Sequence, residues 1–570
     1  MEKELIEFIQ THELKPFNKS KTQIKSSTST IFKTRDAKSI HAKALSVITK
    51  KFAFPDTANL LDYFDTTPQE KEITKKQEFF KKLFPINNEF LKQLKQPKPF
   101  WNPDYGIVVV TEEDSTFQTL KELGCSVKFL VDETDLSDLE RYDIVQVLDC
   151  DNFQFALEKL PQTLFLRSVD EAYLERYVRE LSGWHENLKI LKEVQTTEEI
   201  SQIVSELFNL SNLYEKSENK KLTREFVEET LNKIKAEVAQ SVKELNISGD
   251  TLLEVLNKGA LPTELKKIVK EVISKTGLPE EIFLQQIPVQ IDEKELEKTL
   301  RTQDISQFAN LAEEIKRNAQ TLTKVPEKLR ALETQLLLLD FKSTIAKWTQ
   351  GGNFSEISSS LELHEASNEF LENPSPINFH LSQQQRCSIL TGANSGGKTT
   401  LIEHIIQLLS YAYLGLPVKG SFKFPVFTEI YYFAKNKGSM SKGAFETLLT
   451  QLSQIQPGTK TLILADEIEA VTEPGVAGKM IAASAQYFID QGCFLIFATH
   501  LGQEIQKILP DNARIDGIEA KGLDEFNELI VDHNPVIGKL ASSTPELIVE
   551  KMAKTSGKEY FSFLNSYLKK

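Results

Sequence analysis

Residues 386–401 have the sequence Arg-Cys-Ser-Ile-Leu-Thr-Gly-Ala-Asn-Ser-Gly-Gly-Lys-Thr-Thr-Leu. A short apolar run ends at Gly392, a glycine-rich loop follows, and an apolar helical spacing begins at Leu401. A strand, a phosphate loop and a helix therefore follow one another, with the spacing Gly-x-x-x-x-Gly-Lys-Thr intact. The alternative, a chance glycine loop before a helix, is disfavoured by the strand that precedes it and the helix that follows.

The residue types in this loop suit a nucleoside triphosphate. Glycines let backbone N–H groups surround the phosphates, and the helix N-terminus presents the positive end of its dipole to the same anion. Lys398 would reach the outer phosphates, and the Thr399 hydroxyl would be a ligand of Mg²⁺. The expected ligands are therefore ATP and Mg²⁺. The expected ATP-binding residues are Gly392, Ala393, Asn394, Ser395, Gly396, Gly397, Lys398, Thr399 and Thr400.

Two later apolar strands end in groups that complete such a site. Thr461–Ala465 is followed by Asp466 and Glu467, and adjacent residues at a strand end point in different directions. Asp466 can therefore hold Mg²⁺, directly or through water, while Glu467 addresses the attacking water. A third strand, Phe494–Thr499, ends at His500, which we expect to orient that water. A single histidine can also be an ordinary structural residue.

A segment of small residues at 437–449 precedes the carboxylate strand. It is a turn that opens a helix, so its serines and backbone N–H groups form a second anion site. The phosphate loop already holds the phosphates of its own protomer, so a second anion site suggests ATP held between two protomers. The alternative is an ordinary N-capped helix. The residues expected to act on the partner's nucleotide are Ser439, Ser441 and Gly443.

Size and composition indicate an intracellular, multidomain protein. A chain of 570 residues is too long for one core. Hydrophobic and charged contents of 40% and 26% are ordinary for a globular protein, and no apolar run is long enough to span a membrane. The charged N-terminus lacks the apolar core of a signal peptide, and the four cysteines have no metal-ligand spacing. A cytoplasmic location is expected.

The charge is unevenly distributed along the chain. A net charge of −14 excludes a surface that is basic everywhere, but residues 1–100 are rich in lysine. Such asymmetry suggests a polyanionic partner, and a solvated, partly disordered arm explains it equally well. We expect this region to be small and mostly helical. Its basic residues include Lys15, Lys33, Arg35, Lys38, Lys43, Lys50, Lys51, Lys75, Lys76, Lys92 and Lys95.

Short strands alternate with helical patterns in the next stretch. The strands are expected at Ile107–Val110, Val127–Val131 and Ile144–Leu148, with a helix at Phe117–Leu123. This alternation predicts a small α/β domain with a parallel sheet that ends near Leu166. The stretch contains no dinucleotide-binding signature, so we interpret it as a scaffold.

Residues 173–348 have a helical pattern and many charges. Apolar residues repeat at helical spacing over Ile200–Tyr214, Ile305–Ile315 and Leu322–Leu339, and several glycines and prolines separate the first block from the others. A long helix leading out, an irregular tip and a long helix returning would make an antiparallel arm. Lysines near the tip could contact nucleic-acid phosphates, although a solvated helix face is the commoner reason for such residues. They are Lys258, Lys266, Lys267, Lys270 and Lys275.

In combination, these motifs resemble those of the MutS family of ABC-type ATPases. The phosphate loop at 391–400, the Asp466-Glu467-Ile468 strand end with the following 472–475 turn, and Phe497–His500 are each similar to a motif of that family. The segment Leu361–Glu365 resembles the stretch that leads into its ATPase domain. The resemblance covers roughly residues 335–552. Upstream of it, the helical arm is similar to the lever and clamp of the family.

Two differences from the family pattern indicate which branch of the family this sequence resembles. The family's mismatch-recognition domain carries a Phe-x-Glu pair, which is absent from the first hundred residues, and no nuclease-like extension is expected after Lys551. The plan resembles the shorter archaeal members of the second MutS branch. That resemblance implies a homodimeric, ATP-hydrolysing clamp on double-stranded or branched DNA, without sequence or mismatch specificity, acting in recombination or DNA repair.

The resemblance also divides the chain and leaves alternatives open. A related clamp could grip ribosomes as a quality-control ATPase, and mismatch recognition or a structural chromosome ATPase are further alternatives. The expected fold is multidomain, with α and α/β parts. The expected segments are a basic N-terminal region at 1–100, a small α/β connector-like domain at 101–172, a long antiparallel helical lever and clamp at 173–348, an ABC-type P-loop ATPase domain at 349–522 and a C-terminal dimerisation segment at 523–570.

Overall fold

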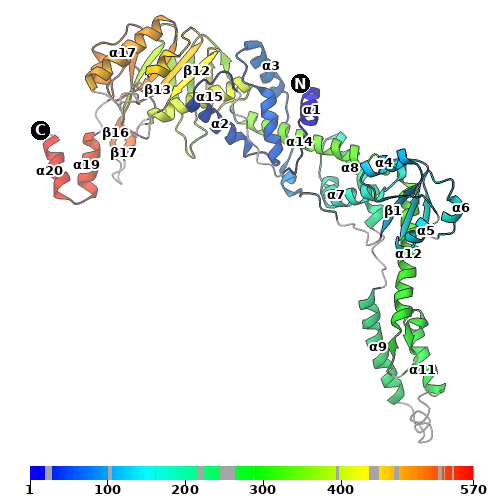
Figure 1. Cartoon of the computed structure of the whole chain (residues 1–570). Helices are drawn as coiled ribbons and strands as arrows, with labels where there is room; N and C mark the ends of the chain where they lie inside the picture. Colours follow the sequence, from blue (N-terminus) through cyan, green and yellow to red (C-terminus); the bar gives the residue numbers. More distant parts are fainter. Residues whose placement is uncertain are drawn as a thin grey trace. The chain divides into compact units, whose positions relative to one another are not determined.

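The computed structural model contains two compact units. Unit 1 comprises residues 1–95 and 333–570, and unit 2 comprises residues 96–332. Figure 1 labels many of their helices and several of their strands. The structure describes residues 1–18, 29–99, 106–132, 134–160, 162–215, 223–243, 263–284, 286, 288–392, 397–434, 449–467, 474–523, 529–531, 533–541 and 545–568.

A five-stranded parallel sheet forms the centre of unit 1. Its order is β12-β13-β14-β10-β15, so the carboxyl ends of β10, β14 and β13 lie next to one another. The strands are buried nearly throughout, as expected for a parallel sheet that is covered on both faces. Their bounds are β10 Cys387–Gly392, β12 Glu429–Phe433, β13 Thr461–Asp466, β14 Phe494–Ala498 and β15 Ala513–Ile518.

Helices cover both faces of this sheet. Helix α15 (Lys398–Leu414) follows β10, and helix α2 (Arg35–Thr49) packs against it, with the Tyr411 hydroxyl donating to the Ala44 carbonyl at 3.2 Å (Figure 1). Because α15 lies between α2 and the sheet, nearly all of its residues are buried. Helices α17 (Pro474–Asp490) and α18 (Gly502–Gln506) belong to a second apolar cluster with the strands.

The N-terminal residues belong to unit 1. The expected helical character is confirmed, and residue Phe32 forms a parallel bridge with Ile430, which extends the sheet beyond β12. Two of the N-terminal lysines form ion pairs with this part of the unit, Lys33 with Glu429 and Lys43 with Glu403. The remaining N-terminal elements are α1 Glu2–Thr11, η2 Pro55–Phe64, α3 Glu70–Lys81 and η3 Glu89–Gln93.

The rest of unit 1 consists of a second sheet and the C-terminal elements. The second sheet has the order β7-β11-β8-β9, and β16 pairs with β17 antiparallel. The strands are β7 Glu356–Ile357, β8 Leu361–Ala366, β9 Ile377–Leu381, β11 Ser421–Phe424, β16 Ala520–Leu523 and β17 Leu529–Val531. The last helices are α19 Pro545–Thr555 and α20 Glu559–Leu568, which pack against each other.

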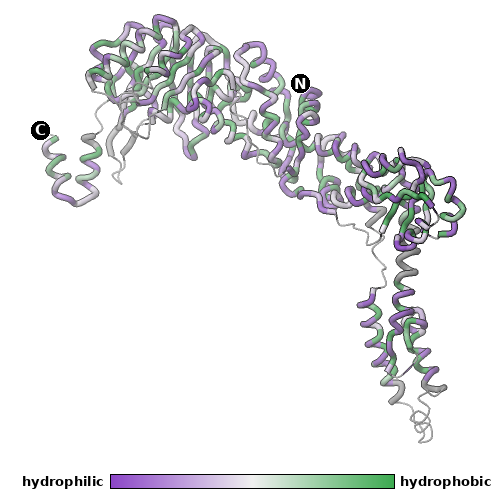
Figure 2. Tube along the Cα trace, in the orientation of Figure 1, coloured by the Kyte–Doolittle hydropathy of each residue, from purple (hydrophilic) through white to green (hydrophobic). Residues whose placement is uncertain are grey.

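Unit 2 contains the predicted α/β domain with its parallel sheet. The strand order is β2-β1-β3-β4, and apolar residues follow the strands (Figure 2). The elements are β1 Ile107–Thr111, α4 Asp114–Glu122, β2 Val127–Phe129, α5 Thr134–Ser137, η4 Asp138–Arg141, β3 Ile144–Val147, α6 Gln154–Leu157, β4 Thr163–Phe165 and η5 Val169–Glu171.

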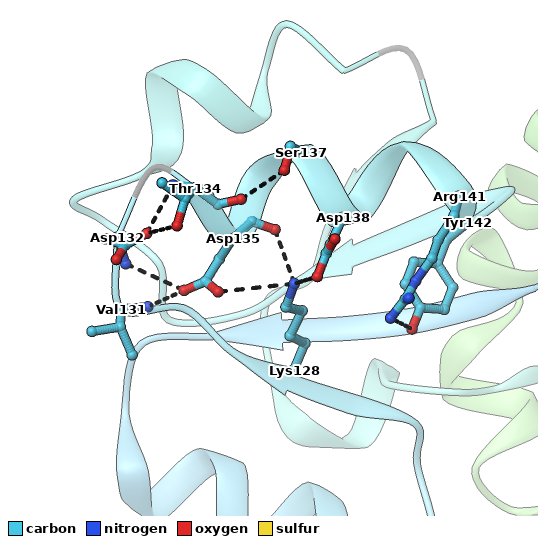
Figure 3. Close-up of polar contacts among 9 residues, drawn as sticks. All are labelled: Lys128, Val131, Asp132, Thr134, Asp135, Ser137, Asp138, Arg141 and Tyr142. Carbon is cyan, nitrogen blue, oxygen red and sulfur yellow. Dashed lines mark hydrogen bonds and ion pairs between the residues drawn. The ribbon is translucent and has the colours of Figure 1, made fainter.

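Strand β2 ends at Phe129, two residues earlier than the sequence predicts. A polar network around Lys128 explains the early end (Figure 3). The Lys128 ammonium pairs with Asp138 at 2.9 Å, while the Asp135 carboxylate accepts hydrogen bonds from the backbone N–H groups of Val131 and Asp132. These N–H groups are therefore engaged by a side chain and do not continue the sheet.

The helical part of unit 2 differs from the expected out-and-back pair. Within the described residues of this stretch, three helices stand in place of one long outgoing helix, and a further helix and a two-stranded hairpin follow them. A helical period cannot separate one long helix from two that fold back on each other. Here α7 and α8 pack together, with His185 and Ser211 hydrogen-bonded at 3.1 Å. The elements are α7 Glu175–Glu193, α8 Glu198–Glu215, α9 Arg224–Lys243, α11 Thr263–Ser274, η7 Glu280–Ile282, β5 Phe283–Leu284, β6 Gln290–Ile291, α12 Glu293–Arg317 and α13 Ala319–Leu322. The next helix, α14 Val325–Gln350, begins in unit 2, and its residues from Glu333 onward belong to unit 1.

Among the described residues, none of the helices is long and apolar enough to cross a membrane.

Candidate nucleotide site

The phosphate loop leaves strand β10 through a backbone conformation that requires glycine. Gly392 has φ +139°, and a Cβ added there would lie 2.5 Å from the Ile518 carbonyl oxygen of the neighbouring strand β15. A side chain would therefore collide with backbone and not with a movable group. Helix α15 begins at Lys398, as the motif predicts. The predicted ligands at 393–396 lie outside the described residues.

Lys398 is held at the centre of the site. Only 3% of it is exposed, and its ammonium donates to the Gly392 carbonyl at 2.6 Å. The same Nζ lies 3.4 Å from His500 Nε2 and 4.0 Å from Glu467 Oε1. A buried ammonium that faces the loop is suited to binding an anion there, because such a charge is costly unless it is paired.

Thr399 and Asp466 place oxygen atoms side by side. The Thr399 hydroxyl donates to Asp466 Oδ2 at 2.5 Å, although the two residues come from α15 and β13. Asp466 is 2% exposed. A hydroxyl and a carboxylate are hard oxygen ligands of the kind Mg²⁺ prefers, with the remaining positions filled by phosphate and water. The pair therefore fits the predicted cation.

Glu467 and His500 come together from adjacent strands. The Glu467 N–H donates to the Ala498 carbonyl at 2.9 Å, and Glu467 has φ +48°, an unusual conformation for a residue other than glycine. Its Oε1 lies 2.9 Å from His500 Nε2. An ionised carboxylate only accepts hydrogen bonds, so with Glu467 ionised the N–H of His500 Nε2 donates this hydrogen bond. The approach of Lys398 to the same nitrogen is then a close contact between two donors.

The structure brings five predicted residues into one cluster. They converge because β10, β14 and β13 are neighbours and the carboxyl ends of parallel strands meet at one edge of the sheet. Thr400 follows in the first turn of α15. The clustered residues are Lys398, Thr399, Asp466, Glu467 and His500.

The other predicted site residues are not part of this cluster. Ser439, Ser441, Gly443 and Lys258 lie outside the described residues. The remaining lysines belong to α11 in unit 2 or follow it directly, where Lys270 pairs with Glu280 at 3.4 Å and Lys275 with Glu271 at 3.5 Å. Lys266 and Lys267 are exposed on that helix.

The sequence interpretation missed His533. A Cβ added at Gly397 would lie 3.0 Å from His533 Nδ1, so this imidazole lies directly against the phosphate loop. The next residue fixes the segment, since the Asn534 side chain accepts from the Asn378 N–H at 2.7 Å and donates to the Pro376 carbonyl at 3.0 Å. A histidine beside the Asn-Pro pair was the available signal, but no periodicity or motif spacing connects it to the loop.

A buried ion pair supports the loop from below. Arg514 Nε donates to Asp516 at 2.9 Å, and the Asp516 carboxylate also accepts from the Ser388 hydroxyl at 2.6 Å and the Gly538 N–H at 2.9 Å. These bonds connect β15 to β10 and to the segment that follows β17. Because the ion pair is buried and fully hydrogen-bonded, removing one partner would leave an uncompensated charge beneath the site.

Comparison with known proteins places this site in a family. No family model matches the chain. It is 30% identical to the DNA-binding protein MutS2 of Pyrococcus furiosus, over 94% of this chain and 99% of that protein. An Endonuclease MutS2 of Solidesulfovibrio magneticus is 34% identical over 21% of this chain and 17% of its own length. A DNA mismatch repair protein MutS of Thermotoga petrophila is 26% identical over 38% of this chain and 27% of its own length. Similarity over nearly the whole of both chains, with the phosphate-loop cluster in place, shows that the chain belongs to the MutS family.

Proposed function

We propose that the protein is a Mg²⁺-dependent ATPase that binds DNA as a homodimer, without sequence or mismatch specificity. The observation that carries the ATPase assignment is the convergence of Lys398, the Thr399–Asp466 pair and the Glu467–His500 pair at one sheet edge. Each group has the chemistry that one part of phosphoryl transfer needs.

Residues of α15 and the neighbouring strand ends would bind the phosphates and Mg²⁺. Lys398 binds the outer phosphates and exchanges its contacts with Gly392 and Glu467 for phosphate oxygens. Thr399 and Asp466 would hold Mg²⁺, which would neutralise charge on the phosphate oxygens. His533 lies against the loop on the side of Gly397, where it can contact the nucleotide.

The hydrolytic half falls to β13 and β14. Glu467 accepts a hydrogen bond from the attacking water and takes up its proton as the water oxygen bonds to the γ-phosphorus and the bond to ADP breaks. His500 donates to Glu467 and so holds the carboxylate in place. With its side chain 37% exposed, the imidazole lies at the mouth of the site.

Dimerisation would complete the site, with Ser439, Ser441 and Gly443 of one protomer reaching the ATP of the other. The exposed aromatic face of α20 supports a partner contact, because Tyr560, Phe563 and Tyr567 are 64%, 64% and 68% exposed. Large aromatic side chains grouped on one exposed face commonly mark protein interfaces.

DNA is the proposed polymer partner. The Pyrococcus furiosus relative that matches this chain over its whole length is described as DNA-binding, and exposed Lys266 and Lys267 on α11 offer phosphate contacts. Contacts to phosphates carry no sequence information, so we propose binding to double-stranded or branched DNA in recombination or repair. A cytoplasmic location accords with four unpaired cysteines.

The decisive experiment is the Glu467→Gln variant. It should lower kcat for ATP hydrolysis by on the order of 10²-fold or more while ATP still binds, because the amide cannot take the proton. Glu504→Gln, an exposed glutamate of α18, is the matched control and should leave turnover unchanged. Hydrolysis at the wild-type rate in Glu467→Gln would remove Glu467 from its proposed role.

The same variant tests the partners. With ATP trapped, light scattering should show a dimer, and DNA retention should depend on salt but not on a mismatch. Binding to duplex DNA, branched DNA and ribosomes is compared at matched salt, with and without ATP. Preferential co-sedimentation with ribosomes would replace DNA by the quality-control alternative, and a clear preference for mismatched duplex would favour mismatch recognition.

A further inference from the structure

A polar cavity of about 230 Å³ lies in unit 1, apart from the residues of the nucleotide cluster. At roughly 30 Å³ per water molecule, it has room for several waters or for one small anion with its hydration. It opens where the end of α2, the short helix η3 and the last turns of α14 meet. The lining residues are Lys51, Ala53, Asn88, Glu89, Lys92, Thr344, Lys347 and Trp348.

The floor of this cavity is a chain of hydrogen bonds. The Lys347 ammonium donates to Asn88 Oδ1 at 2.6 Å, and Asn88 Nδ2 donates to the Thr344 hydroxyl at 3.1 Å. Thr344 in turn donates to Asp340 at 3.4 Å. Asn88 and Thr344 are 8% and 5% exposed, so the floor is buried and its geometry is held without a ligand.

Two lysines of the cavity lining contact neighbouring side chains. Lysine in a last helical turn commonly satisfies terminal carbonyls. Here Lys347 is bonded to the Asn88 side chain, and the Lys51 ammonium lies over the Trp348 ring at 4.4 Å from its centroid. Both ammonium groups therefore contact side chains that line the cavity, where an anion would meet them.

The side chains that line the cavity carry a net positive charge. Three lysines against Glu89 give a net charge of +2 in a chain whose overall charge is −14. The Asp340 carboxylate behind the floor is bound to the N–H groups of Ala53 and Phe54 at 3.0 Å and to the Thr57 hydroxyl at 2.7 Å. Its lone pairs are thus occupied, and burial raises its pKa.

We propose that this cavity binds a phosphate monoester dianion, whose charge of about −2 matches that of the lining. Lys51, Lys92 and Lys347 contact its oxygens from three elements. One face of Trp348 is covered by Lys51, and the ring makes an edge-to-face contact with Tyr411, with ring centroids 5.5 Å apart, so the face under Lys51 is closed to a stacking base. The phosphate group is recognised, whether it is a free phosphomonoester or the 5′-phosphate end of a strand.

The cavity is connected to the phosphate-loop helix. Trp348 Nε1 donates to the Pro417 carbonyl at 3.1 Å, and Tyr411 belongs to α15. An anion that draws Lys51 off the indole therefore changes the surroundings of Trp348 next to the carboxyl end of α15. Trp348 fluorescence reports on occupancy for this reason.

The test is a phosphate titration in the Lys398→Ala background, which removes binding at the nucleotide loop. Inorganic phosphate is titrated by calorimetry and by tryptophan fluorescence at constant ionic strength. Lys51→Met with Lys347→Met keeps the aliphatic stems and should weaken binding at least tenfold. Glu89→Gln raises the lining charge to +3 and should tighten binding about threefold or more, an effect that misfolding cannot imitate.

Matched controls come from the N-terminal region of unit 1. Lys50→Gln with Lys82→Gln removes two exposed lysines that do not line the cavity, and binding should be unchanged. The proposal is overturned if the Lys398→Ala protein binds no phosphate. It is equally overturned if both lining variants, including Glu89→Gln, bind phosphate as the control does.

Oligonucleotides distinguish the two sources of the phosphate. If a 5′-phosphorylated single strand binds at lower concentration than adenosine monophosphate and inorganic phosphate, the source is a strand end. If the small molecules bind as well, the source is a free phosphomonoester. If a 5′-hydroxyl strand competes as well as the phosphorylated one, the cavity binds backbone diesters and the monoester assignment is wrong. Because all arms use Lys398→Ala, none depends on ATP hydrolysis.

Discussion

His404 is a neutral histidine inside helix α15, two turns after the phosphate loop. It is 0% exposed, and burial lowers its pKa from 6.5 to about 4. His41, on the helix that packs against α15, is 4% exposed and its pKa is also lowered to about 4 by burial. Both rings would have to become charged in a place where charge is costly.

The stability of unit 1 should therefore fall on acidification. Between pH 6.5 and about 4 the unfolded chain binds a proton at each histidine and the folded chain does not, so the stabilisation present above pH 6.5 is lost as the pH falls. Each group adds a slope of about 1.4 kcal/mol per pH unit. His404→Leu should reduce the slope of urea-unfolding free energy by about that amount, and exposed His12→Gln should not. An unchanged slope in His404→Leu would contradict the assignment.

At the residue scale, the positions of the motifs after their strands predicted the nucleotide cluster, because the ends of neighbouring parallel strands must lie close together. Once a loop follows β10 and acids follow β13, the adjacency of carboxyl ends brings Lys398, Asp466 and Glu467 together. The contact between His500 and Glu467 and the left-handed backbone of Glu467 are consequences of packing, which a residue pattern does not contain. The approach of His533 depends on a loop anchored by Asn534, and for the same reason it was not predicted.

Among the elements, α15 and α3 meet at one glycine. Gly415 ends α15 with φ +76°, and a Cβ added there would lie 2.5 Å from the Cβ of Lys76. The Lys76 ammonium donates to the Tyr413 carbonyl at 3.3 Å in the last turn of α15, and burial lowers its pKa to about 8. The end of α15 is thus capped by a cation from the N-terminal region.

Gly415→Ala should destabilise unit 1 by about 2–4 kcal/mol, since it combines a strained left-handed residue with overpacking against a neighbouring helix. Gly475→Ala is the matched control, because a Cβ at that position meets nothing within 4 Å. Chemical denaturation of both variants gives the comparison. Equal stability of the two would show that α3 moves aside without cost.

Helix α11 carries the proposed DNA contacts and offers an internal control. Lys266→Gln with Lys267→Gln should weaken duplex binding and lower the log–log salt slope by about 2, one for each lost phosphate contact. Lys270→Gln with Lys275→Gln removes lysines already paired with glutamates, so it should change the slope less. Filter binding between 50 and 200 mM salt, about the range over which such slopes are resolved, measures both. A larger effect on the salt slope from Lys270→Gln with Lys275→Gln would contradict the assignment of the DNA contacts to Lys266 and Lys267.

At this scale the helical arm shows what periodicity can predict. Ile200–Tyr214 was correctly predicted as helical, and three strands of the small parallel sheet were predicted, whereas its fourth strand, β4 at Thr163–Phe165, was not. The breaks between α7, α8 and α9 were not predicted. A helix that folds back on its neighbour buries the same apolar stripe as one that runs straight, so only tertiary contacts such as His185–Ser211 distinguish them.

For the whole molecule, two compact units should unfold as two transitions, and Mg²⁺-ATP should stabilise only one. Ligand at about 100 times its Kd adds about 2.7 kcal/mol to the state that binds it. Calorimetry should therefore show that the Tm of unit 1 rises by several degrees while the Tm of unit 2 is unchanged. Lys398→Ala should abolish the shift. A rise of both transitions, or a rise in Lys398→Ala, would contradict the assignment of the nucleotide to unit 1.

The division into units also shows where the lysine-rich N-terminal residues belong. Composition allowed either a polyanionic partner or a solvated, partly disordered arm, and the structure places residues 1–95 in one compact unit with residues 333–570. The lysines were visible in the sequence, but their partners, such as Glu403 and Glu429, lie more than three hundred residues away. Pairing over that distance has no local signature, and therefore only the structure reveals it.

The bridge between Phe32 and Ile430 has a consequence for biosynthesis. At roughly 5–20 residues per second, a ribosome needs about 20–80 s to travel from one partner to the other. For most of that interval α2 has been made but α15 has not, so the apolar face of α2, with Ile40, Ala44 and Ile48, lacks its native cover. Nascent chains should accordingly recruit a chaperone early and release it only after the phosphate-loop helix has emerged from the exit tunnel.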